Sequence, residues 1–299
     1  MPTLSASPSV MAIRLLVALI ALGLLHLMPR LARWRRDGLF RRWVAQLSDT
    51  SGVGRVVLAL LPPLAVCLLL SWLFDHPPLG ELLGLIFSLI VLLYCFGPRE
   101  FESDVEAILN APDPLRREAA AQQLIDDESV LVWTAPGLGE AVAYAALRRR
   151  FAVLFWLFLL GPFGALLYRF SQTLARSESL PLDESSRTAA RYLANALDWA
   201  PAQLLVFTLA IVGHWDAVIG AWRRWHSQAA ATSWYTSPPG FLGAAAQADI
   251  ISDIEAGDGY FEERSEPLTE LQRLRGALLR ALLAWLSVVA LIVIGGWVS

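Results

Sequence analysis

The feature that most constrains this chain is a set of long apolar stretches without a charged residue. Residues 56–74 and 281–297 contain no Asp, Glu, Lys or Arg. At about 1.5 Å per residue, a helix of such length nearly crosses a hydrocarbon core of roughly 30 Å. Hydrophobic residues make up 56% of the chain and charged residues 17%, which is more apolar than soluble domains are. The sequence therefore predicts an integral membrane protein.

Two further stretches complete a set of four uninterrupted spans. Residues 10–28 form the first, and we expect the long side chain of Arg14 to reach the membrane interface. No small-residue cleavage site follows it, so we expect this segment to remain as a span. Residues 79–97 form the third, across the lone charge of Glu81, and the last extends over about residues 278–298.

Two other apolar stretches leave the number of membrane crossings open. Residues 151–168 are interrupted by the sequence Gly161-Pro162-Phe163-Gly164, and residues 199–219 carry Pro201 and Gln203. Each could cross the bilayer as a tilted span, or both could be broken, re-entrant helices packed inside the bundle.

The arginines indicate the orientation. The loop between the first two spans holds seven of them, whereas the first nine residues, residues 75–81 and the C-terminal tail hold none. By the positive-inside rule the loop is cytoplasmic, in a bacterial inner membrane, and both termini are periplasmic. Residues 98–150 and 220–277 are then cytoplasmic helical segments. Four arginines favour the re-entrant alternative, which keeps them cytoplasmic: Arg169, Arg176, Arg187 and Arg191.

The expected fold class is all-α. Outside the spans, apolar and charged residues alternate at helical spacing, as in residues 102–124, and no useful strand-like alternation occurs. We expect one membrane domain over residues 1–299. It would be a polytopic helical bundle with four uninterrupted spans, two short broken helices and amphipathic cytoplasmic helices.

Composition also excludes several functions. Every basic residue is an arginine, which rules out the lysine of a phosphate-binding loop, of a kinase-like site and of a pyridoxal-phosphate Schiff base. A net charge of -3 gives no footprint for nucleic acid. The only cysteines, Cys67 and Cys95, lie in apolar stretches, so we expect neither a disulfide framework nor a zinc site. We expect no cofactor.

A polar stripe leads into the second broken segment. A capping pattern at Asp183 predicts a helix, and four polar residues then recur at positions i, i+4, i+8 and i+11, on one helix face. One interpretation is a pocket wall for an anionic or amide-bearing ligand at the membrane edge. The alternative is a solvated face of an interfacial helix. The four residues are Arg187, Arg191, Asn195 and Asp198.

Three more features allow both a functional and a structural interpretation. The break at Gly161 could expose half-helix ends to a ligand, or it could be a kink that permits close packing. His214, beside Asp216, could take part in catalysis or cap a helix. Acidic residues within 249–266 could bind Mg²⁺ or form a solvated loop. The candidate ligand-binding residues, with none assigned to catalysis or a metal, are Trp156, Gly161, Gly164, Tyr168, Arg169, Arg187, Arg191, Asn195, Asp198, Gln203 and His214.

Several short motifs resemble, in order and spacing, those of the AmpE family. They are Leu154-Phe155-Trp156, Leu160-Gly161-Pro162, residues 164–168, Leu197-Asp198-Trp199-Ala200-Pro201, residues 210–214 and Ala221-Trp222. The resemblance implies an inner-membrane signalling or accessory protein in β-lactamase induction and the response to cell-wall damage. The partners that it implies are the lipid bilayer and either a muropeptide amidase or a small amphiphilic ligand.

AmpE proteins are in turn distantly similar to the CobD/CbiB-type membrane enzymes of cobalamin synthesis, which form an amide. This chain departs from their pattern, because Arg148-Arg149 replaces an Asp-Gly pair, Ala175 replaces an aspartate and Gln203 replaces an arginine. An ATP-dependent ligase needs acidic groups for Mg²⁺ and a base. We therefore expect a non-enzymatic sensor that binds its ligand between the break at Gly161 and Asp198. The alternatives are an amide-forming enzyme of the adenosylcobinamide-phosphate synthase type and a transporter.

Overall fold

The computed structural model describes residues 8–27, 37–47, 49–74, 80–96, 101–125, 131–177, 179–256 and 266–295. Every regular element in these ranges is a helix, which confirms the predicted all-α class. Part of the first arginine-rich loop and the acidic residues 257–265 lie outside the described residues. The chain forms two compact units. The first unit comprises residues 1–100, 153–191 and 284–299, and the second comprises residues 101–152 and 192–283.

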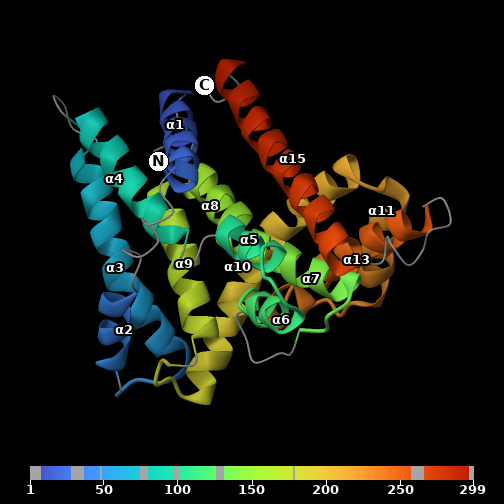
Figure 1. Cartoon of the computed structure of the whole chain (residues 1–299). Helices are drawn as coiled ribbons and strands as arrows, with labels where there is room; N and C mark the ends of the chain where they lie inside the picture. Colours follow the sequence, from blue (N-terminus) through green and yellow to red (C-terminus); the bar gives the residue numbers. More distant parts are fainter. Residues whose placement is uncertain are drawn as a thin grey trace. The chain divides into compact units, whose positions relative to one another are not determined.

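The first unit is a bundle of mainly apolar helices (Figure 1). In it, α9 packs against α3 and α4, while α1 packs against α4. The ring of Phe40 on α2 stacks on that of Phe170 on α9, with 4.0 Å between ring centroids. Its helices are α1 (Pro8–Leu27), α2 (Gly38–Ala45), α3 (Gly52–Phe74), α4 (Gly80–Cys95), α8 (Ala152–Leu160) and α9 (Pro162–Arg176).

The second unit is built around α13, which packs against both α7 and α11. Small residues allow the close approach to α7. A Cβ atom on Gly139 would lie 2.1 Å from Cδ1 of Ile250, and one on Gly243 would lie 2.5 Å from Oε1 of Glu140. The elements of this unit are α5 (Phe101–Leu109), α6 (Pro114–Gln122), α7 (Ala135–Ala146), the π-helix η2 (Leu147–Phe151), α11 (Trp215–Gln228), α12 (Ser233–Thr236) and α13 (Gly240–Glu255).

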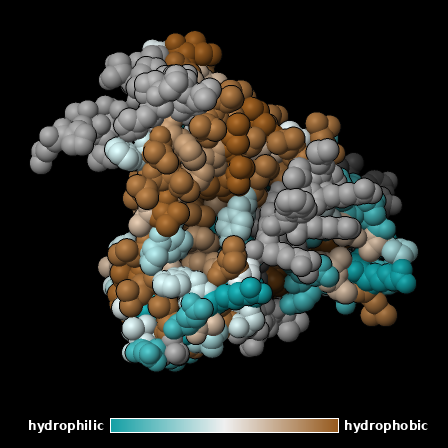
Figure 2. Space-filling view, turned by 90° about the vertical axis from the view of Figure 1, so that its left-hand side faces the viewer, coloured by the Kyte–Doolittle hydropathy of each residue, from teal (hydrophilic) through white to brown (hydrophobic). Residues whose placement is uncertain are grey.

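Two long helices, α10 (Glu184–Val212) and α15 (Pro267–Ile294), contribute residues to both units. Together with α1 from Val10 onward and α3, they are the helices long and apolar enough to cross a membrane among the described residues. The helix α4 adds a shorter apolar segment, Leu82–Cys95. Apolar side chains cover the surface on the side where α3 and α4 lie (Figure 2). The chain is a polytopic membrane protein.

The helix α10 differs from the segment expected over residues 199–219. Its polar first half and apolar second half form one continuous helix of 29 residues, with Pro201 inside it. The helix stops at Val212, and α11 begins at Trp215 after the corner Gly213-His214. The expected segment is therefore divided between two helices at this glycine.

The break predicted at Gly161 is confirmed, since α8 ends one residue before it and α9 begins one residue after it. Gly161 has a φ of +70°, where a side chain would be strained. The side chain of Arg14, which we expected to reach the membrane interface, contacts the end of α8. Its Nη1 donates a 2.7 Å hydrogen bond to the carbonyl oxygen of Phe158 at the end of α8. A guanidinium is a suitable partner for the free carbonyls of a helix end.

Candidate functional site

The predicted ligand-binding residues are divided between the two units. The first unit contains Trp156, Gly161, Gly164, Tyr168, Arg169, Arg187 and Arg191, and the second contains Asn195, Asp198, Gln203 and His214.

In the first unit, the polar members of this set bind neighbouring protein groups. Arg169 donates from Nη2 to Oδ2 of Asp37 at 2.9 Å, and the hydroxyl of Tyr94 donates to the other oxygen of Asp37 at 2.9 Å. This arrangement ties α9 to α4 and to the start of α2. Tyr168 is buried. A Cβ on Gly164 would lie 2.4 Å from the carbonyl oxygen of Trp156, so this glycine is required where α9 leaves the break.

The start of α10 confirms the predicted capping pattern. Asp183 accepts hydrogen bonds from the hydroxyls of Ser185 and Ser186 and from the backbone N–H of Ser186. These hydrogen bonds lower the pKa of the Asp183 carboxyl below its ordinary value, with the serine hydroxyls as the largest cause. The carboxylate also lies 3.5 Å from Nη1 of the buried Arg55.

The polar stripe on α10 changes character along its length. Arg191 is exposed and lies 3.9 Å from an exposed Glu184 carboxylate, a geometry that contributes little stability. Asn195 is buried, and its Nδ2 donates to the carbonyl oxygen of Tyr235 at 3.2 Å. Asp198 is 0% exposed. The solvated-face interpretation therefore fits the first half of the stripe, whereas the second half faces the protein interior.

Arg148 is the partner of Asp198. Its Nε lies 3.7 Å from Oδ2 of Asp198, and its guanidinium lies 5.1 Å from the ring centroid of Tyr144. A buried carboxylate needs such a cation, because an isolated charge is costly to desolvate. Sequence reasoning had recorded Arg148 only as a departure from the synthase pattern and did not place it at the site.

Three consecutive arginines of the π-helix η2 contact three separate carboxylates. Beside the pair just described, Arg149 donates to Oδ2 of Asp104 at 2.6 Å, and Arg150 donates to Oε1 of Glu102 at 2.9 Å. A π-turn is wider than an α-turn and is often found at functional sites. Here it ends a helix whose last side chains line a cavity.

That cavity has a volume of about 330 Å³. One wall carries Glu140, Tyr144 and Arg148, at intervals of four residues along α7 and η2, so their side chains follow one another on the same face. The remaining lining residues are mostly apolar: Leu124, Ile125, Leu131, Val132, Gly137, Ala141 and Pro238. The cavity thus has an acid toward one end of the polar row, a guanidinium toward the other, and an apolar wall.

Neighbouring groups fix the polar row. The hydroxyl of Tyr144 donates to the carbonyl oxygen of Pro239 at 3.0 Å, and burial raises the pKa of Tyr144 to about 12. The phenol therefore stays protonated at neutral pH. Nε2 of Gln247, on α13, donates to Oε2 of Glu140. Among the described residues, no cluster of three or more His, Cys, Asp or Glu side chains could hold a metal ion. The arrangement is suited to binding a molecule that is polar at both ends.

Gln203 belongs to a separate aromatic cluster in the second unit. Its Oε1 accepts from Nε1 of Trp222 at 2.7 Å, and its Nε2 lies 3.1 Å from Nε2 of His226. Nδ1 of His226 lies 2.9 Å from the carbonyl oxygen of Trp222. A neutral ring protonated on Nδ1 satisfies both contacts. The ring of His226 also lines an open groove with Trp199, Trp225 and Trp234.

His214 lies at the corner between α10 and α11 and is not among the residues that line the cavity. Its backbone N–H donates to Oδ1 of Asp249 at 2.8 Å. Asp249 is on α13 and is buried, so the acidic stretch predicted as a solvated loop begins inside the protein. The rest of that stretch from residue 257 to 265 lies outside the described residues.

Comparison with known proteins then decides the family. The sequence model described as "Regulatory signalling modulator protein AmpE" matches residues 13–236. The chain belongs to the AmpE family. The matched range contains the polar row of the cavity and also Asp198, the partner of Arg148. Asp249 lies after the end of the matched range. The predicted resemblance to AmpE proteins is confirmed.

A second comparison supports the more distant resemblance. This AmpE-family chain is 28% identical over 224 residues to a protein named "Cobalamin biosynthesis protein CobD" from Chromobacterium violaceum, with 71% of this chain and 68% of that protein covered. No solved structure matches the chain. The family description supports a membrane signalling or accessory role.

Proposed function

We propose that this protein is a non-enzymatic sensor or accessory protein of the bacterial inner membrane that acts in β-lactamase induction and the response to cell-wall damage. We further propose that it binds a small amphiphilic ligand in the cavity of the second unit. The observation that carries the binding proposal is the row of Glu140, Tyr144 and Arg148 facing an apolar wall, with Arg148 held by the buried Asp198. The family description supports the signalling role.

The cavity defines the chemistry of its ligand. An anionic or carbonyl group fits beside Arg148, since a guanidinium offers donors only. An ammonium or amide N–H group fits beside Glu140, and an apolar body fits against Leu124 and Val132. Burying about 100 Å² of that body would contribute about 2.5 kcal/mol. Of the ligand-binding residues predicted from the sequence, this site includes Asp198. It adds Glu140, Tyr144 and Arg148, which were not predicted.

An amide-forming enzyme is the second candidate, and the similarity to the CobD protein favours it. The charge arrangement argues against it. Asp198 is already paired with Arg148, and Glu140 is the one carboxylate among the lining residues that the structure describes. A ligase that uses Mg²⁺ and ATP needs more acidic groups than that. For a transporter, the broken helix would be the supporting feature, but Arg14 occupies the carbonyl end of α8 at the break.

The test is the activity of β-lactamase after a β-lactam challenge, with and without this gene, in a host that has the inducible enzyme and an intact muropeptide amidase. We expect deletion to change the induction curve, the wild-type gene to restore it and Arg148→Gln to fail. The matched control is Arg116→Gln on α6, because that side chain is 73% exposed and lines no described cavity. An unchanged curve on deletion would refute the signalling role, and cobinamide-phosphate synthesis would be assayed next.

A further inference from the structure

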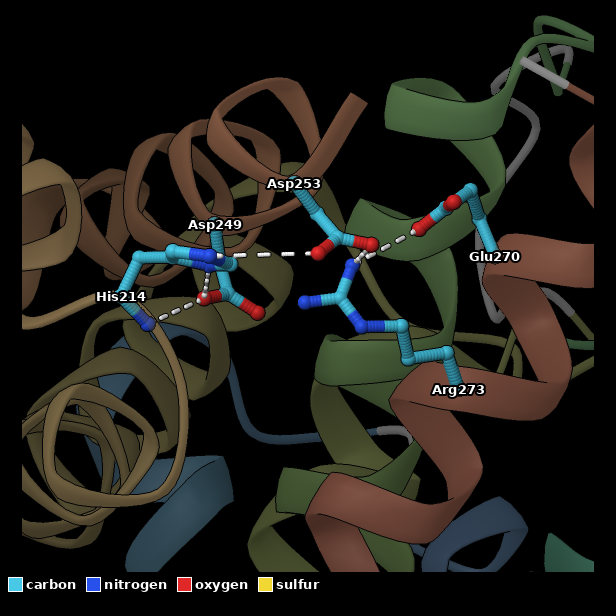
Figure 3. A network of polar contacts seen from close by, with 5 residues as sticks. All are labelled: His214, Asp249, Asp253, Glu270 and Arg273. Carbon is cyan, nitrogen blue, oxygen red and sulfur yellow. Dashed lines mark hydrogen bonds and ion pairs between the residues drawn. The ribbon is translucent and has the colours of Figure 1, made fainter. Parts of the chain in front are cut away.

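A second polar cluster, outside the cavity, joins three segments of the second unit (Figure 3). His214 lies at the corner after α10, Asp249 and Asp253 lie one turn apart on α13, and Glu270 and Arg273 lie on the first part of α15. Asp249 and Glu270 are 7% and 3% exposed. The proposed ligand site uses none of these residues.

The imidazole of His214 has a carboxylate on each side. Its Nδ1 lies 3.1 Å from Oδ1 of Asp249, and its Nε2 lies 3.8 Å from Oδ1 of Asp253. The shorter distance is that of a hydrogen bond, whereas 3.8 Å is the distance of an ion pair, for which the ring must carry a charge. A protonated ring can therefore form an ion pair with each carboxylate.

Other charged side chains surround this contact. Arg273 is paired with Asp253 and lies 3.4 Å from Oε2 of Glu270, and Arg280 lines a small cavity with Asp249 and Glu270. The carboxylates of Asp249 and Asp253 on α13 and of Glu270 on α15 thus lie near two arginines of α15. A proton on His214 would add a further positive charge beside these partly buried carboxylates, whose desolvation makes a cationic neighbour favourable. Asp216, on α11 itself, is exposed.

The corner is shaped for this contact. A Cβ on Gly213 would clash with Oδ1 of Asp249, so a larger residue here would displace the Asp249 carboxylate from its present position. The adjoining cavity of about 20 Å³ has room for about one water molecule. The backbone bond from His214 to Asp249 does not depend on the charge of the ring. The contact to Asp253 is the part that a proton adds.

We propose that His214, Asp249 and Asp253 form a proton-operated clasp. By this we mean a contact between the α10–α11 corner and α13 that is complete only when His214 carries a proton. Uptake of a proton fixes α13 through both Asp249 and Asp253, and release of the proton leaves only the contacts to Asp249. Acidification, which supplies this proton, therefore closes the clasp. This inference does not depend on the identity of the ligand or on the role in β-lactamase induction.

The test is amide hydrogen exchange of residues 240–255 in the purified full-length protein, at about pH 5.5 and about pH 8, on either side of the usual histidine titration. After correction for the intrinsic pH dependence of exchange, we expect about fivefold greater protection at the lower pH, the upper end of the effect of one partly exposed ion pair. His214→Gln should remove this difference, because glutamine cannot gain a charge.

The matched control is His226→Gln. Its ring nitrogens face Gln203 and the carbonyl of Trp222, so this variant should keep the pH difference. Asp253→Asn is the second variant. It preserves the contacts of His214 to Asp249 and should shrink the difference even where His214→Gln fails to fold. Equal protection at both pH values in the wild type, or a difference that survives in His214→Gln, would overturn the proposal.

Discussion

Replacing Asp198 by asparagine should destabilise the second unit strongly. The carboxylate is completely buried, and the side chain of Arg148 is only 10% exposed, so the substitution removes a carboxylate partner from a desolvated guanidinium. Removal of one partner from a buried ion pair costs about 3–5 kcal/mol. We expect Asp198→Asn and Arg148→Met each to fall in that range in equilibrium unfolding of the purified protein.

The double variant Arg148→Met, Asp198→Asn separates folding from function. It removes both charges while it keeps much of the packing volume, and such a replacement of a buried pair is often close to neutral. We therefore expect it to be more stable than either single variant, with a coupling energy of about 2 kcal/mol or more in a double-mutant cycle. Induction of β-lactamase should nevertheless remain lost, because the proposed ligand loses its cationic partner.

Two results would refute this reasoning. A cost below about 1 kcal/mol for Asp198→Asn would place the pair in the range of exposed salt bridges. Additive effects in the cycle would show that the two charges do not act together. Arg116→Gln supplies the reference for an exposed pair, since its partner Asp113 is also exposed, and it should change stability by no more than about 0.5 kcal/mol.

Three other predictions concern the break, the topology and the phenol. Gly161→Ala should cost about 1–3 kcal/mol of unfolding free energy because of its positive φ, whereas Gly23→Ala, with nothing within 4 Å of the added atom, should not destabilise α1. A cysteine at Ser177 should stay unlabelled by an impermeant thiol reagent in outer-permeabilised cells and become labelled after lysis; labelling before lysis would contradict the re-entrant arrangement of residues 151–168. The phenol of Tyr144 has a raised pKa of about 12 in the folded protein, so between about pH 10 and pH 12 the phenol of the unfolded chain ionises first and the wild type loses stability. Tyr144→Phe lacks this phenol, so its loss of stability over the same pH range should be smaller.

Local features of the sequence were sufficient for much of the fold. Span length and the absence of charge predicted α1, α3 and the apolar part of α15, because these properties act within one segment. The Gly161-Pro162 pair predicted the break, since a glycine with positive φ followed by a proline at the first helical position determines local geometry. The continuity of α10 through Pro201 was not predicted, because packing along the whole helix overrides one local signal.

The candidate site was harder to predict because its residues depend on contacts distant in sequence. Asp198 was identified from its position on a stripe, but its partner Arg148 comes from a π-turn 50 residues earlier, which no local pattern indicated. Similarly, Asp249 and Asp253 belonged to an acidic stretch that composition assigned to a loop. Their helix α13 is anchored by buried apolar residues such as Phe241 and Ile250, and this packing turns the two carboxylates toward His214.

The helix α13 connects the two proposed sites. Gln247 donates to Glu140 of the cavity wall, and Asp249 and Asp253, half a turn and about two turns further along, hold His214. Since α13 and α7 approach so closely at Gly139 and Gly243, a shift of α13 must move or distort the wall that carries Glu140. Thermodynamic linkage then makes the two effects reciprocal. If closing the clasp with a proton changes the affinity for the ligand by a given factor, binding of the ligand changes the affinity of the clasp for the proton by the same factor. Gln247→Leu would remove the direct polar link from α13 to Glu140 while leaving His214 intact. The proton-dependent protection of α13 should persist in that variant, and its influence on the cavity should weaken.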